Sequence, residues 1–139
     1  MKKITLLFVL LSFILTVSAG AQEGKKEHPI NQWLAKCIQR DESTAGMRNC
    51  TAQAYDMWDK ELNKAYKSLM NKLSPDGKKA LKTSQLAWIK YRDAKSKFND
   101  EITAFKGGTL YLLMGDSSRM EMVKERTLEL RRYIGILDE

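Results

Sequence analysis

The chain has 139 residues, with 24 Lys and Arg against 17 Asp and Glu, one His and two Cys. This length fits one domain and is too short for a dinucleotide-binding domain followed by a second domain. One His and two Cys nearly exclude a structural zinc domain, because its tetrahedral shell would need carboxylates to be complete. The mean hydropathy of -0.44, with 43% hydrophobic residues, argues against both a polytopic membrane protein and a disordered chain.

Residues 1–21 have the layout of a secretory signal peptide. Two lysines precede an apolar run over residues 4–17, and Ala19-Gly20-Ala21 supplies the small residues that signal peptidase recognises. The run of 14 residues is short for a membrane-spanning helix, which needs about 20. We therefore expect cleavage after Ala21 and a periplasmic or secreted product that does not span the membrane. Residues 22–30 are expected to form a flexible polar leader in which the single His is solvated.

Export bears on both the net charge and the cysteines. Removal of Lys2 and Lys3 lowers the net charge from +7 to +5, because all 17 acids remain. Cys37 and Cys50 are the only cysteines, and thiols oxidise outside the cytoplasm, so we predict a structural disulfide between them. A redox-active pair would normally have two residues between its cysteines.

The remainder of the chain shows helical signals. Apolar residues recur in steps of three and four, or helix start and stop residues occur, in four segments: residues 31–40, 44–73, 75–105 and a last one beginning within 110–119 and ending near 136. Ser74 and Pro75 are an N-cap and a first helical residue, whereas Gly107 and Gly108 are a helix stop. These signals predict one all-α domain over residues 31–137, an antiparallel bundle of three long helices plus a short disulfide-stapled N-terminal helix.

The middle long helix sorts into two faces when each residue advances by about 100°. The stripe expected to face the core contains Ala80, Leu81, Gln85, Trp88, Tyr91, Phe98, Ile102 and Phe105. The opposite side is a candidate binding face with lysines around two apolar residues: Lys78, Lys79, Lys82, Leu86, Ile89, Lys90 and Lys97. This face fits an anionic protein, glycan or lipid head group, and a merely solubilising role is the alternative. Nucleic acid fits poorly, because interleaved aromatic residues for base stacking are missing.

Arg92 falls on the predicted core side of this helix, close to Trp88. An unpaired guanidinium there would be very unfavourable, so we expect a carboxylate partner from a neighbouring helix, either Asp59 or Glu129. The pair would fix the register of the helices.

Four short motifs occur in order along the chain: Asp59-x-x-Leu62-Asn63-x-x-Tyr66, Gln85-x-x-Trp88-x-x-Tyr91-Arg92-Asp93, Gly107-Gly108 and Arg126-x-x-Glu129-x-x-x-Tyr133. With these motifs, the chain resembles the lysozyme-inhibitor LprI-like family of small exported helical domains over residues 37–133. The resemblance implies lysozyme inhibition, an activity of few members, and no inhibitory loop carries over residue by residue. The family's usual second cysteine pair corresponds here to Ser96 and Ser118.

Three functions are compatible with these observations. The preferred one is an exported, non-enzymatic envelope module that recognises a protein or an anionic glycan through a helical face. The first alternative is an inhibitor of lysozyme, which against basic animal lysozymes would need an acidic surface on the last helix, such as Asp116, Glu121, Glu125 and Glu129. The second alternative is an envelope enzyme, for which the chain lacks a phosphate loop and a metal triad. We predict no catalytic residue, metal or cofactor.

Overall fold

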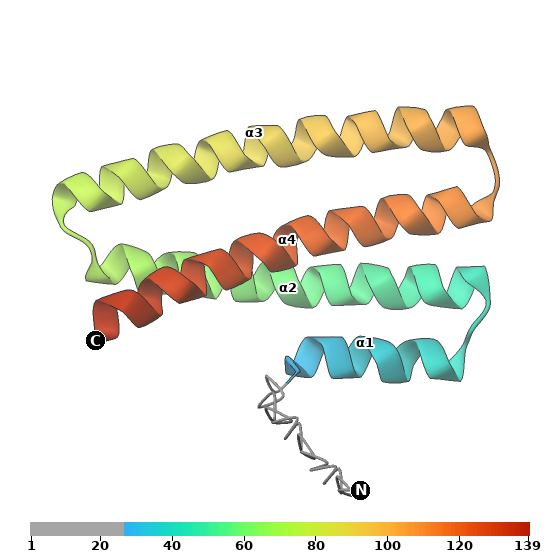
Figure 1. The fold of residues 1–139 in the computed structure, drawn as a ribbon, viewed down its shortest axis with the longest axis horizontal. Coiled ribbons are helices and arrows are strands. Elements are labelled where there is room, and N and C mark those ends of the chain that lie inside the picture. The colour runs from blue at the N-terminus through green and yellow to red at the C-terminus, as the bar shows by residue number, and fades with distance from the viewer. Residues whose placement is uncertain (1–26) are drawn as a thin grey trace, which may run out of the picture.

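The computed structural model describes residues 27–139, and the predicted signal peptide lies outside them. These residues form four helices and no strand: α1 (Pro29–Arg40), α2 (Thr44–Lys72), α3 (Pro75–Lys106) and α4 (Thr109–Asp138). The all-α prediction is confirmed. Figure 1 shows the helices in the spatial order α1, α2, α4, α3, so the last helix in sequence lies between α2 and α3. Within the described range, no helix combines the length and apolar character needed to cross a bilayer.

The ends of α3 follow local sequence signals. The backbone N–H of Gly77 donates to Ser74 Oγ at 3.2 Å, and Pro75 occupies the first turn, where its missing N–H is harmless. Gly107 and Gly108 have φ values of 68° and 88°, a region that other residues rarely adopt. Because these two glycines complete the turn, α4 begins at Thr109, earlier than the sequence predicted.

The packing of α2 against α4 makes the centre of the core. The largest fully buried side chains belong to these two helices: Trp58, Val123, Thr127 and Leu130. The Thr127 hydroxyl donates to the carbonyl oxygen of Val123 at 2.8 Å, and it lies 3.4 Å from the carbonyl oxygen of Trp58. The buried Thr127 hydroxyl therefore has an acceptor and does not weaken the packing.

The predicted disulfide holds α1 against α2. Cys37 and Cys50 are bonded, both are buried, and their Cα atoms lie 5.8 Å apart. The first turn of α2 requires a glycine at position 46, because a Cβ atom there would lie 2.1 Å from the side chain of Asp41, which follows α1. The disulfide and this close approach together fix the angle at which α2 begins.

The expectation of a solvated histidine in the leader is wrong. His28 is the N-cap of α1, and its Nδ1 accepts the backbone N–H of Ile30 at 3.2 Å. Its ring lies 4.3 Å from the ring of Trp58, centroid to centroid. Accordingly α1 begins at Pro29, within the segment predicted to be a flexible leader. The buried Trp58 ring of α2 gives this end of the chain a surface to pack on.

The stripe predicted to be the core side of α3 is only partly buried. Leu81 is buried, and Gln85 and Trp88 are half-buried against α4. The other members of the stripe are exposed: Ala80, Tyr91, Phe98, Ile102 and Phe105. The prediction placed the whole stripe on the core side, whereas α3 packs mainly on α4 alone. A single neighbour covers only a narrow sector of a helix, so the rest of the apolar stripe stays exposed, with Tyr91 at the edge of the contact with α4.

Reduction of the disulfide is expected to lower the free energy of unfolding by about 3 kcal/mol, because the bond spans 13 residues of chain and restricts the unfolded state. Urea unfolding followed by circular dichroism, with and without dithiothreitol, measures this loss. The Cys37→Ser/Cys50→Ser variant is the control, since reductant should not move its midpoint. An unchanged midpoint for the reduced native protein would contradict a structural role.

Candidate functional site

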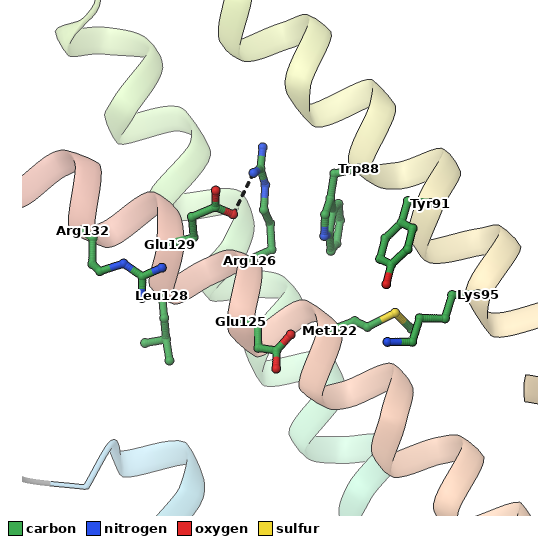
Figure 2. A pocket seen from close by; sticks show the side chains of 9 residues that line it. All are labelled: Trp88, Tyr91, Lys95, Met122, Glu125, Arg126, Leu128, Glu129 and Arg132. Atoms are coloured by element: carbon green, nitrogen blue, oxygen red, sulfur yellow. Dashed lines mark hydrogen bonds and ion pairs between the residues drawn. The ribbon is translucent and has the colours of Figure 1, made fainter.

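A groove between α3 and α4 brings several family-motif residues together. Figure 2 shows Trp88 and Tyr91 projecting from α3 toward α4, which contributes Arg126 and Glu129. The groove has a volume of about 460 Å³, and its lining is completed by Lys95, Met122, Glu125, Leu128 and Arg132. Apart from Met122 and Leu128, the side chains that meet here are aromatic or charged.

Arg126 is the buried cation of this interface, with 6% of its surface exposed. Its Nε donates to Gln85 Oε1 at 3.0 Å, and its Nη2 donates to Ser84 Oγ at 3.0 Å. Its Nη1 lies 2.8 Å from Glu129 Oε2. One guanidinium thus joins α4 to two residues of α3 and to an acid one turn along its own helix. We infer that Arg126 positions the two helices.

The predicted partners of Arg92 are wrong. Arg92 pairs with its neighbour Asp93 at 2.7 Å, and its guanidinium carbon lies 5.4 Å from the centroid of the Trp88 ring. Glu129 is the partner of Arg126. Asp59 instead accepts a hydrogen bond from Asn63 within α2. The physical reason is again the edge position of α3, which keeps Arg92 at the rim of the interface, far from α2.

The buried arginine had a sequence signal of its own. Arg126 lies between Val123 and Leu130, at helical spacing, within the apolar side of α4. A cation in such a position predicts a satisfied, buried guanidinium more directly than an arginine on an edge helix does.

Other motif residues also have structural contacts. Leu62 is buried in the core, and Tyr66 packs against it. Tyr133 is exposed near the end of α4. Asn99 Nδ2 donates to Ser118 Oγ at 3.0 Å, which joins α3 to α4. Ser118 is one of the two positions where the resemblance implied a second disulfide in other family members. Asn99 lies one helical turn from the other position, Ser96.

The acidic residues predicted to form a surface on the last helix are largely neutralised. Three of them have a basic partner: Asp116 pairs with Arg48, Glu121 with Lys124, and Glu129 with Arg126. Glu125 joins no ion pair within residues 27–139. Nor does any cluster of His, Cys, Asp or Glu in that range have a geometry fit for a metal ion. Therefore α4 offers little free negative charge to a basic partner.

The lysine face is defined by the seven residues named above: Lys78, Lys79, Lys82, Leu86, Ile89, Lys90 and Lys97. It lies on the sides of α3 that α4 does not cover. All five lysines are exposed, and in the described part of the chain none of them joins an ion pair. Leu86 is 53% exposed and Ile89 is half-buried. The positive charge of α3 is consequently available to a partner.

These features define a small, disulfide-stapled helical domain whose buried polar side chains join helix to helix. The family described as Lysozyme inhibitor LprI matches residues 36–130. The chain belongs to this family, in agreement with the motifs, and an inhibitor family fits a module without catalysis.

A solved structure has the same fold. It is the crystal structure of an uncharacterized protein from Burkholderia thailandensis, which is 26% identical with a TM-score of 0.75. The similarity covers 81% of this chain and 56% of that one, so the chain spans little more than half the length of that protein. Among curated proteins, none matches this chain.

Replacing Arg126 by Met is expected to lower the free energy of unfolding by about 3 kcal/mol, because Glu129 loses its charge partner while Gln85 and Ser84 lose a donor. Arg92→Met is the matched control and should cost less than about 1 kcal/mol, since its pair is at the surface. Urea unfolding measures both values. Equal losses would show that Arg126 is not the cation on which the interface depends.

Stability should fall as the pH drops below about 6.5. Desolvation and then the nearby Arg131 lower the pKa of His28 from its ordinary value of 6.5, so the unfolded chain binds this proton more readily than the folded chain. The contribution of neutral His28 is therefore complete above pH 6.5 and is lost as the pH falls toward the lowered pKa. His28→Asn keeps a capping side chain without titrating, and its melting temperature should fall less between pH 7 and pH 5. Identical slopes for both proteins would contradict the assignment.

Proposed function

We propose that the protein is an exported, non-enzymatic envelope module that binds a lysozyme through the lysine face of α3. The observation that carries the proposal is the free charge of that face, set against the ion-paired acids of α4. Membership in a family described as lysozyme inhibitors supports the choice of partner.

The charge of the lysine face is compatible with a basic lysozyme because electrostatics act at two ranges. Two net-positive proteins repel each other weakly beyond the Debye length, which is about 8 Å at physiological salt. At contact, the local charges decide, and glycoside hydrolases hold a pair of carboxyl groups beside the bond that they cleave. Lysine ammonium groups complement such a cleft, and an inhibitor that covers it would stop catalysis without catalysing anything itself.

The apolar residues of the face add to this complementarity. Leu86 is exposed among lysines, so it would be desolvated only when a partner covers it. Interfaces commonly combine such an apolar centre with a charged rim.

An anionic glycan or lipid head group is the second candidate partner, since the same unpaired lysines favour it. The two candidates differ in the expected readout. Lysozyme would be inhibited in a purified mixture, whereas a glycan or lipid partner would retain the protein on envelope material and leave lysozyme active.

The Lys79→Glu/Lys82→Glu/Lys90→Glu variant is expected to raise the concentration for half-inhibition of an animal lysozyme at least tenfold, which corresponds to about 1.4 kcal/mol of binding free energy. The assay is lysis of cell-wall substrate with purified components. Lys36→Glu/Lys60→Glu/Lys67→Glu is the matched control, because it changes the charge equally on exposed positions of α1 and α2.

The control variant should inhibit as the native protein does. Equal losses in both variants would indicate a net-charge effect without a docking face. Absence of inhibition by the native protein would remove lysozyme as the partner, and retention on anionic envelope fractions would then test the second candidate.

A further inference from the structure

A second set of apolar side chains on α3 stays largely exposed within residues 27–139 and lies apart from most of the lysines. Tyr91 stands at its edge and also lines the groove toward α4. Four large side chains in this set are exposed: Tyr91 by 56%, Phe98 by 63%, Ile102 by 46% and Phe105 by 85%. Three exposed alanines lie on the same side of the helix: Ala80, Ala87 and Ala94. At about 100° per residue, all seven fall within a sector of roughly 80°. We name these seven residues the aromatic–alanine stripe.

We propose that two copies of this protein form a dimer by packing their aromatic–alanine stripes against each other with the α3 helices antiparallel. The order of large and small residues carries this inference. Placing the two-fold axis between residues 92 and 93 sets every large ring opposite an alanine of the second copy: Phe98 opposite Ala87, Phe105 opposite Ala80, and Tyr91 opposite Ala94. Large side chains inserted opposite small ones are the packing that helix pairs require.

Symmetry makes each of these contacts occur twice, because a two-fold interface is self-complementary. Three independent pairs satisfy the same register, since the residue numbers within each pair have the same midpoint. A parallel arrangement would instead set Phe98 against Phe98 and Phe105 against Phe105. The antiparallel register is therefore the one that avoids overcrowding at the rings.

The groove between α3 and α4 lies at this axis. Trp88, Tyr91 and Lys95 line it, and their positions span residues 92 and 93 (Figure 2). In the proposed register, Lys95 of the second copy comes level with residue 90, beside the groove that contains Glu125. Since Glu125 has no ion-pair partner within residues 27–139, unlike charges would face each other across the axis.

The area is sufficient for a specific interface. An aromatic side chain has about 150–250 Å² to bury, so the exposed fractions correspond to about 450 Å² per copy for the four large residues. Two copies have about 900 Å² of these four side chains available to bury, close to the roughly 1,000 Å² expected of a biological interface, and the three exposed alanines add to it. The centre of the lysine face lies roughly 130° around the helix from the stripe, so a dimer would leave both lysine faces free.

Sedimentation equilibrium of the purified exported protein, without lysozyme, tests the dimer. The native protein should have the mass of a dimer, and Phe98→Glu/Phe105→Glu should have the mass of a monomer. Both rings are exposed in the single chain, so circular dichroism should show an unchanged helix content. Leu86→Glu is the control, because Leu86 is also exposed on α3 but belongs to the lysine face, and this variant should stay dimeric.

Cross-linking tests the register. A mixture of Ala87→Cys and Phe98→Cys chains should form an intermolecular disulfide under mild oxidation, whereas each variant alone should not, because its own cysteines would be about 16 Å apart along the helix. Ala80→Cys mixed with Phe98→Cys is offset by about 10 Å and should not cross-link. A native protein that remains monomeric at every concentration, or equal cross-linking in the two mixtures, would overturn the proposal. Neither outcome depends on whether lysozyme is inhibited.

Discussion

The packing of α2 against α4 is the constraint on which the other parts of the structure depend. Trp58 is fully buried at its centre, and its indole Nε1 has no hydrogen-bond partner in the described residues. An unsatisfied buried donor typically costs about 1–3 kcal/mol, which is comparable with the free energy gained by burying a large ring. The wide apolar contact with Val123 and Leu130 must therefore supply most of the net stabilisation. The seam holds because it combines this contact with a satisfied Thr127 hydroxyl.

The two remaining helices attach to opposite sides of that seam by different chemistry. A covalent bond between Cys37 and Cys50 fixes α1, and the His28 ring extends its contact to Trp58. The attachment of α3 is polar at its middle, where Arg126 reaches Gln85 and Ser84. This arrangement leaves α3 with a single helical neighbour, and its surface divides into a side on α4, a lysine face and an aromatic–alanine stripe.

The division of α3 is the feature from which the proposed binding function is argued. The buried guanidinium of Arg126 is fully engaged within the protein. It pairs with Glu129 on its own helix and donates hydrogen bonds to Gln85 and Ser84 of α3. Among residues 27–139, unpaired lysines and large exposed apolar side chains occur together on α3, which packs mainly on α4 alone. Such groups are available to a partner, and the chain belongs to the family described as Lysozyme inhibitor LprI.

The sequence by itself determined the helices, their capping residues, the disulfide and the family, because these depend on local spacing or on the identity of a few residues. Ser74, Gly107 and Cys37 act through neighbours close in the chain or through unique chemistry. Which side of α3 is covered was decided only by the tertiary structure. An apolar stripe at helical spacing has the same pattern whether one helix or two pack on it, so Phe98 and Phe105 were indistinguishable from core residues. The ion pair of Glu129 with Arg126, and not with Arg92, follows from the same edge position.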